Sequence, residues 1–168
     1  MKKLLFVLAL TALIATGAAF ADHPGGLGIG IQGGFGGNWS GGALGSPALS
    51  LKVPRIPIFW AIRLDISPDY AGLGVSGDYY FIHSKLVPDI NLHWYLGVGG
   101  YLRLGSDNPA RLGVGARVPV GLSWQPIPLL EVFLQLVPSL GASLGFSLPP
   151  DFRLDGGYGG DIGIRIWL

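Results

Sequence analysis

The chain has 168 residues, no cysteine, 12% charged residues and a formal net charge of +1. Without cysteine it forms no disulfide, thiolate metal site or lipoprotein anchor, and its nearly balanced charge gives no electrostatic basis for binding nucleic acid. Charged residues are scarcer than the ~25% of soluble domains, yet no apolar run of the ~20 residues that a spanning helix needs follows residue 21.

The first segment has the pattern of a secretory signal peptide. A basic start precedes an apolar run over residues 4–14, and small residues follow, with Ala19 and Ala21 in the A-x-A arrangement that a signal peptidase accepts. The alternative is an uncleaved anchor, but the run is short for a span. We therefore expect residues 1–21 to be a cleaved signal peptide and residues 22–168 to be one exported domain.

Beyond the signal peptide, apolar residues recur with a period of two. In residues 90–105 the even positions are apolar or glycine, whereas the odd positions are mostly polar, aromatic or glycine. Because a strand sends successive side chains to opposite faces, this is the pattern of a two-faced strand. The same alternation, interrupted by turn-forming clusters, predicts strands over residues 27–36, 47–54, 56–66, 70–83, 90–105, 110–125, 129–146 and 153–168.

Prolines mark the places where this assignment is open. Residues 47–66 form either two strands or one long strand kinked at Pro54 and Pro57. Pro119 and Pro138 lie inside strand patterns, and because proline has no N–H to donate, each predicts a bulge or a distorted rim.

The length of the alternating segments predicts the fold class. Several exceed the ~5–6 residues of an ordinary strand and match the ~9–11 tilted residues that cross a bilayer. In lipid no sheet edge can stay unpaired, so such strands must close. We therefore predict an all-β fold, an eight-stranded antiparallel transmembrane β-barrel with up-and-down meander topology and an apolar outer face. It has periplasmic turns near 54–57, 84–89 and 125–128, and outward loops near 36–46, 67–70, 106–109 and 147–152.

Two segments resemble a known family. Residues 112–124 read LGVGARVPVGLSW and residues 130–138 read LEVFLQLVP. They are similar to a small, largely uncharacterised outer-membrane barrel family common in spirochaetes, whose members resemble eight-stranded barrels of the OmpX or OmpA type. The resemblance spans most of the mature chain, apart from residues 36–56 and 139–160, and implies a barrel in the bacterial outer membrane but no catalytic residues.

The last strand adds two expected partners. The chain ends in an alternating strand with Trp167 next to the final residue. Outer-membrane barrels end similarly, in a strand with an aromatic residue that the barrel-assembly machinery reads. We therefore expect that machinery and the outer-membrane lipid as partners.

The predicted inner face carries many charged residues. The lumen of an eight-stranded barrel is just filled by side chains, so charges there need partners. We expect Glu131 to pair with Arg111 or Arg117, because their strands are hairpin neighbours. The network is either structural or a gate, in which loss of the Glu131 pair opens a narrow ion path. The set comprises Arg63, Asp65, Asp78, Arg103, Arg111, Arg117, Glu131, Arg153, Asp155, Asp161 and Arg165.

Other motifs give little support for chemistry. The G-x-G-x-x-G pattern at residues 28–33 is followed by further glycines and no helical pattern, so it does not predict a nucleotide site. We predict no cofactor or metal. His23, His83 and His93 have no acid placed by the sequence to orient them, and the neighbours His83 and Ser84 face opposite ways on a strand.

These patterns predict a non-enzymatic integral outer-membrane protein with a structural or surface role and a filled or very narrow polar lumen. One alternative is a ligand-binding or adhesion module that contacts an extracellular ligand through the outward loops, with Trp39 in the 36–46 loop as the candidate surface contact. A narrow pore and a lipid-modifying enzyme are the third and fourth hypotheses, and the sequence predicts no nucleic-acid partner.

Overall fold

The computed structural model describes residues 26–38, 41–67, 70–106 and 110–168. This part of the chain forms antiparallel strands and one short 3-10 helix, and no helix in it has the length and hydropathy needed to span a membrane. The elements are β1 (Gly28–Asn38), β2 (Gly41–Lys52), β3 (Phe59–Ser67), β4 (Tyr70–Val87), η1 (Pro88–Ile90), β5 (Leu92–Gly105), β6 (Arg111–Arg117), β7 (Val120–Ile127), β8 (Leu130–Gly145) and β9 (Asp151–Trp167).

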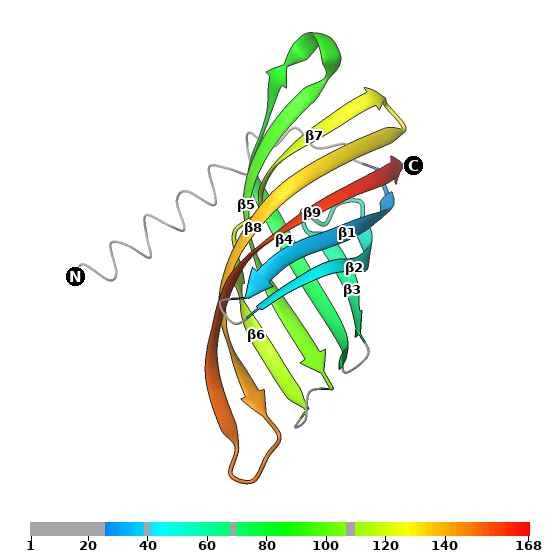
Figure 1. The fold of residues 1–168 in the computed structure, drawn as a ribbon. Coiled ribbons are helices and arrows are strands. Elements are labelled where there is room, and N and C mark those ends of the chain that lie inside the picture. The colour runs from blue at the N-terminus through cyan, green and yellow to red at the C-terminus, as the bar shows by residue number, and fades with distance from the viewer. Residues whose placement is uncertain (1–25, 39–40, 68–69, 107–109) are drawn as a thin grey trace, which may run out of the picture.

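The strands close into a ring. Strands that follow one another in the chain pair with each other, apart from β6 and β7, and β1 also pairs with β9 along its whole length, from Gly28↔Trp167 to Asn38↔Gly157 (Figure 1). β6 and β7 are two halves of one interrupted strand, because both pair with β5 on one side and with β8 on the other. The described residues therefore form a ring of eight strands, which confirms the predicted antiparallel meander.

The interruption between β6 and β7 lies at Val118 and Pro119, one of the two prolines singled out in the sequence. Pro119 has no N–H to donate, but the neighbouring strands stay connected across the gap. The Gly97 N–H donates to the Pro119 carbonyl at 2.9 Å, and the Val118 N–H donates to the Pro138 carbonyl at 3.0 Å. Pro138 causes no such interruption, and β8 continues through it opposite Tyr158.

The structure decides between the two readings of residues 47–66. β2 and β3 are separate strands joined by the turn 53–58, so the single kinked strand is wrong. Arg55 has a φ of 67°, which reverses the chain there. Lys52 also stabilises the turn, because its Nζ donates to the carbonyl oxygens of Val53 at 3.2 Å and Ile56 at 2.7 Å.

The outward loop predicted at residues 36–46 falls in that range but is much shorter, because β1 ends at Asn38 and β2 begins at Gly41. β1 and β2 continue as a hairpin up to the pair Asn38↔Gly41, with a register shift at Gly34/Phe35 that leaves Gly45 unpaired. The segment is rich in glycine, which hides the alternation that marks the other strands. Trp39, the candidate surface contact, lies outside the described residues, so its role stays a prediction.

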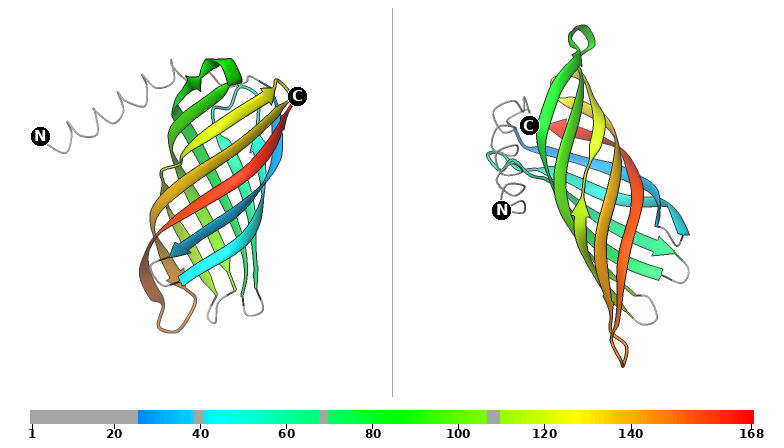
Figure 2. Two further views of the ribbon diagram at one scale, coloured as in Figure 1. Left: turned by 45° about the horizontal axis from the view of Figure 1, so that its top comes forward. Right: turned by 90° about the vertical axis from the view of Figure 1, so that its left-hand side faces the viewer.

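The other connections lie close to their predicted positions at the two ends of the barrel. The turn expected at 84–89 falls at 88–91, because β4 continues to Val87. We call the end that holds the turns 53–58, 88–91 and 128–129 the terminal end, because Leu27 and Leu168 also exchange backbone hydrogen bonds of 2.9 and 2.8 Å there. The opposite end, which holds the β8–β9 connection at 146–150, is the loop end (Figure 2).

The two faces of the strands differ as the alternation predicts. Outward side chains are apolar and exposed, with Ile31 at 64%, Val114 at 58% and Leu136 at 57% of their full accessibility. Inward side chains are polar or aromatic and buried, such as Ser50 at 1% and Asp161 at 3%. The barrel is therefore apolar outside and polar inside, the reverse of a soluble ligand-carrying barrel.

A β-bulge at Phe81 alters this alternation in β4. Tyr80 pairs with Gly97 and Ile82 with Leu96, so Phe81 has no partner residue. Such an extra residue shifts the following side chains to the opposite face. His83, which a strict alternation from Tyr79 would place outside, is therefore buried inside the barrel.

The seam between β1 and β9 can be tested with two glycines of β1. A Cβ at Gly30 would overlap the backbone carbonyl oxygen of Ile164 in β9, whereas a Cβ at Gly33 would meet nothing within 4 Å. We expect Gly30→Ala to lower the free energy of unfolding by about 1–3 kcal/mol through overpacking, and Gly33→Ala to change it by less than about 0.5 kcal/mol. Urea unfolding of the refolded barrels, followed by tryptophan fluorescence, measures both. Equal midpoints for the two variants would contradict the described seam.

Candidate functional site in the barrel lumen

The terminal half of the lumen is filled by aromatic rings. Phe59 of β3 stacks on Tyr80 of β4, and Tyr80 stacks on Tyr95 of β5, each at a centroid distance of 4.4 Å. Trp167 of β9 meets the edge of Phe59 at 6.4 Å. All four residues are at most 6% exposed. Side chains from strands on different sides of the ring therefore meet in the lumen and exclude water there.

A buried ion pair lies beside these rings. Arg165 Nη1 lies 2.6 Å from Glu131 Oε2, and the two residues face each other across β8 and β9. Ser123 Oγ donates to Glu131 Oε1 at 2.8 Å, and Trp167 Nε1 donates to Oε2 at 2.9 Å. Arg165 Nη2 in turn donates to Ser50 Oγ at 2.9 Å. Both carboxylate oxygens are thus hydrogen-bonded, which is the condition for burying such a charge.

Aromatic faces complete the surroundings of the guanidinium. The Arg165 Cζ lies 4.8 Å from the Phe59 ring centroid and 4.6 Å from that of Phe133. A planar cation that is weakly hydrated is attracted to such ring faces. Glu131 and Arg165 therefore form a closed unit, and their side chains are only 7% and 3% exposed.

The predicted pairing of Glu131 with Arg111 or Arg117 is wrong. In register Arg117 lies opposite Ser139 and Arg111 opposite Gly145, both farther along β8 than Glu131. Two residues on neighbouring strands contact each other only if the strand register places them opposite each other. Because these strands are long, Arg111 and Arg117 lie too far along the barrel to reach Glu131. Arg111 instead pairs with Asp151, which lies in the outward loop predicted near residues 147–152.

A second layer of charges lies next to the aromatic cluster, on the side of the loop end. Asp161 is its centre: Arg63 forms an ion pair with Oδ1, and Gln135 Nε2 donates to Oδ2 at 2.8 Å. Arg117 Nη2 approaches Asp161 Oδ2 at 3.7 Å, and its Nε lies 3.1 Å from Asp78 Oδ1. Charges from β3, β4, β6 and β9 are thus neutralised within one level of the barrel.

Gln135 connects the two layers. The hydroxyls of Tyr95 and Tyr80 donate to its Oε1 at 3.1 and 3.3 Å, while its Nε2 donates to Asp161. The side chain is 3% exposed. Gln135, Ser50 and Ser123 are uncharged and so are absent from the predicted charge set, although the alternation places all three on the inner face.

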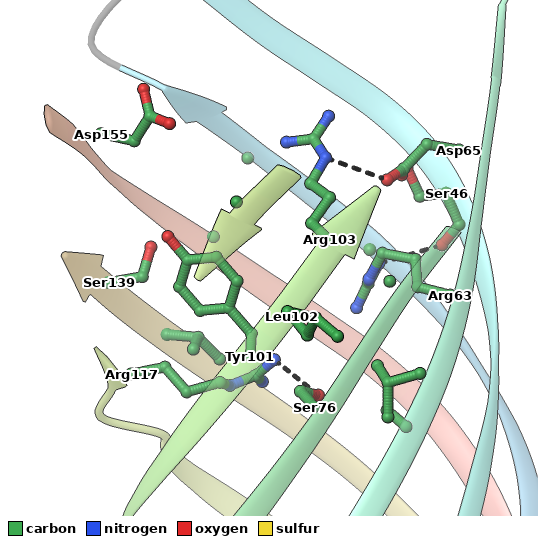
Figure 3. A pocket seen from close by; sticks show the side chains of 18 of the residues that line it. Ser46, Arg63, Asp65, Ser76, Tyr101, Leu102, Arg103, Arg117, Ser139 and Asp155 are labelled. Atoms are coloured by element: carbon green, nitrogen blue, oxygen red, sulfur yellow. Dashed lines mark hydrogen bonds and ion pairs between the residues drawn. The ribbon is translucent and has the colours of Figure 1, made fainter. Parts of the chain in front are cut away.

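The loop half of the lumen is hollow. A cavity of about 570 Å³ occupies it, with walls from every strand except β7. Arg103 Nε lies 3.6 Å from Asp65 Oδ2 in this cavity (Figure 3). Nearer the loop end, Arg153 Nη2 lies 2.8 Å from Asp151 Oδ2. We call this cavity the cup.

The structure divides the predicted charge set between these levels. Glu131 and Arg165 lie in the filled part of the lumen, and Asp78 does not line the cup but forms an ion pair with Arg117, which does. The other members contribute to its lining: Arg63, Asp65, Arg103, Arg111, Arg117, Arg153, Asp155 and Asp161.

The two histidines among the described residues, His83 and His93, pack against each other inside the barrel. His83 and His93 stack at 4.8 Å with an interplanar angle of 10°, next to Tyr95 in the filled half. No group of three or more His, Cys, Asp or Glu side chains in the described ranges is placed to hold a metal ion. His23 lies outside those ranges.

No protein-family model and no curated protein matches the chain. Among solved structures it is similar to neisserial surface protein A (NspA), with 16% sequence identity and a TM-score of 0.47. That match covers 84% of this chain and 96% of that chain. The closure of the present barrel is given by its own pairing of β1 with β9.

The buried ion pair should contribute strongly to stability. We expect Glu131→Ala to lower the free energy of unfolding by about 3–5 kcal/mol, because it leaves the Arg165 cation buried without its acid. Arg153→Ala is the matched control: its ion pair with Asp151 is exposed, with the arginine side chain at 61%, and its loss should cost less than about 1 kcal/mol. Urea midpoints of the two refolded variants give the comparison, and similar midpoints would contradict the assigned role of Glu131.

Proposed function

We propose that this protein is an integral, non-enzymatic β-barrel of the bacterial outer membrane, with a structural or surface role and a lumen closed to ions. The observation that carries the proposal is that the two faces of the ring differ in character. The outer face is apolar on strand after strand, while the terminal half of the lumen is filled by hydrogen-bonded charges and stacked rings.

The outer face supports the membrane location. Exposed large apolar side chains occur on all eight strands of the ring, with β6 and β7 counted as one. Examples are Leu49, Leu73, Leu104, Leu134 and Ile164. A partner protein covers one patch of a surface, whereas lipid covers a complete circumference. A closed ring also satisfies the backbone hydrogen bonds that hydrocarbon cannot.

The filled half supports the closed lumen. An ion passing through would have to displace the Tyr80 and Tyr95 rings and the Glu131–Arg165 pair, all of which are buried. Neither the rings nor the pair can move without losing hydrogen bonds to Gln135, Ser50 or Ser123. Separating such groups in a medium of low dielectric constant is costly.

Gel mobility and extraction of the outer-membrane fraction test the location. We expect the unboiled protein to migrate differently from the boiled protein, because a closed barrel resists detergent unfolding until it is heated. We also expect it to stay with the membrane in urea. Release into the soluble periplasm without a mobility shift would contradict the proposal.

A narrow pore is the second candidate, and the cup favours it, because half of the lumen is already hollow. Planar-bilayer conductance separates the two. Under the closed-lumen proposal neither the wild type nor Glu131→Ala conducts, since Phe59, Tyr80 and Tyr95 still fill the cross-section. Conductance of Glu131→Ala above that of the wild type would instead support a gate at this ion pair.

A further inference from the structure

The cup has the size of a ligand site. Pockets for small molecules have volumes of ~300–1,000 Å³, and the cup has about 570 Å³. It extends from the level of Asp161 and Arg117, which are nearly buried, to the level of Arg153, which is mostly exposed at the loop end.

The charges of the cup are balanced. Five arginines line it, and five carboxylates either line it or form ion pairs with those arginines. A balanced set gives no field that concentrates ions of one sign, so the cup is not built for a simple anion or cation. The arginines are Arg63, Arg103, Arg111, Arg117 and Arg153, and the carboxylates are Asp65, Asp78, Asp151, Asp155 and Asp161.

The lining nevertheless offers many hydrogen-bonding groups of both kinds. Guanidinium groups donate only, carboxylates accept only, and the hydroxyls of Ser139 and Ser143 on the β8 wall do both. An apolar ligand would cover these groups without replacing their hydrogen bonds to water, which is costly. A ligand with several hydroxyls can satisfy donors and acceptors at once.

One aromatic face completes the lining. Tyr101 of β5 lies across the inner surfaces of β6 and β8, where a Cβ at Gly115 would come within 2.6 Å of its Cε1 and a Cβ at Gly141 within 2.5 Å of its hydroxyl. These glycines let the ring lie against the wall. Figure 3 shows Tyr101 standing in the cup among Ser139, Arg117 and Arg103. Its other face is available to the apolar C–H surface of a ligand.

We propose that the cup binds a neutral, polyhydroxylated ligand, a monosaccharide or disaccharide, that enters from the loop end. Sugars combine hydroxyls that both donate and accept with an apolar ring face, which matches the balanced Arg/Asp lining around Tyr101. The inference rests on the proposed function in one respect: the loop end of a membrane-inserted barrel faces outward, where such a ligand is met. It places a ligand site inside the barrel, whereas the ligand-binding alternative predicted from the sequence uses the outward loops.

Binding is measured with the full chain refolded in a zwitterionic detergent. A detergent with a sugar headgroup is avoided, because that headgroup could compete for the cup. The probes are glucose, galactose, N-acetylglucosamine and lactose, and inorganic phosphate and acetate serve as charged comparisons. Saturation-transfer NMR and titration calorimetry measure the binding of each. We expect at least one sugar to bind and neither anion to do so. Tyr101→Ala should weaken sugar binding at least about tenfold, while Tyr101→Phe, which keeps the ring face, should bind within about threefold of the wild type.

A cup-filling variant tests the location of the site. A Cβ at Gly113 would have no neighbour closer than 3.9 Å, and this glycine lines the cup, so Gly113→Leu places a side chain in the cavity without backbone overlap. Gly33→Leu is the matched control, because its side chain points to the outer face and meets nothing within 4 Å. We expect Gly113→Leu to abolish sugar binding and Gly33→Leu to leave it unchanged.

The outcomes separate the inference from the proposed function. No sugar binding by a wild-type protein that shows heat-modifiable mobility would refute the inference and leave the membrane barrel standing. Equal sugar binding by Gly113→Leu and the wild type, or binding of phosphate or acetate as tightly as any sugar, would also refute it. Loss of heat-modifiable mobility in the wild type would refute the proposed function itself.

Discussion

Backbone pairing of the first strand with the last is the constraint on which the other features depend. Because β1 and β9 are joined from Gly28↔Trp167 to Asn38↔Gly157, the sheet has a definite inside and outside. Every strand then faces two environments with a period of two, and side-chain chemistry follows that period. The apolar residues that make this chain unlike a soluble domain are accommodated on the outer face, and the polar residues are confined to a narrow lumen.

That confinement explains the layers inside. A ring of eight strands leaves room for little more than its own side chains, so large inward residues at one level exclude others. Phe59, Tyr80 and Tyr95 take up the terminal half, and Glu131 and Arg165 persist there only because they are hydrogen-bonded to each other and to neighbouring hydroxyls. In the loop half the inward positions are often glycine or serine, and a cup remains.

Local irregularities adjust this regular frame. The bulge at Phe81 turns His83 inward to stack on His93, and Pro119 divides one strand into β6 and β7 without opening the ring. The register shift at Gly34/Phe35 leaves Gly45 unpaired in the glycine-rich β1–β2 hairpin. Each deviation changes which side chains share a level of the lumen, and so shapes the filled half and the cup.

The sequence by itself determined the alternation, most of the turns and the charged character of the inner face, because these depend on residues close together in the chain. It did not determine which charges meet: Glu131 pairs with Arg165 rather than with Arg111 or Arg117, because partners across a tilted barrel are set by strand register. Nor did it reveal the strands within residues 36–46, where glycine conceals the period, or the inward turn of His83, which depends on a single bulged residue. The tertiary structure alone decided that the lumen is filled in one half and open in the other, since that follows from side chains of different strands meeting at one level.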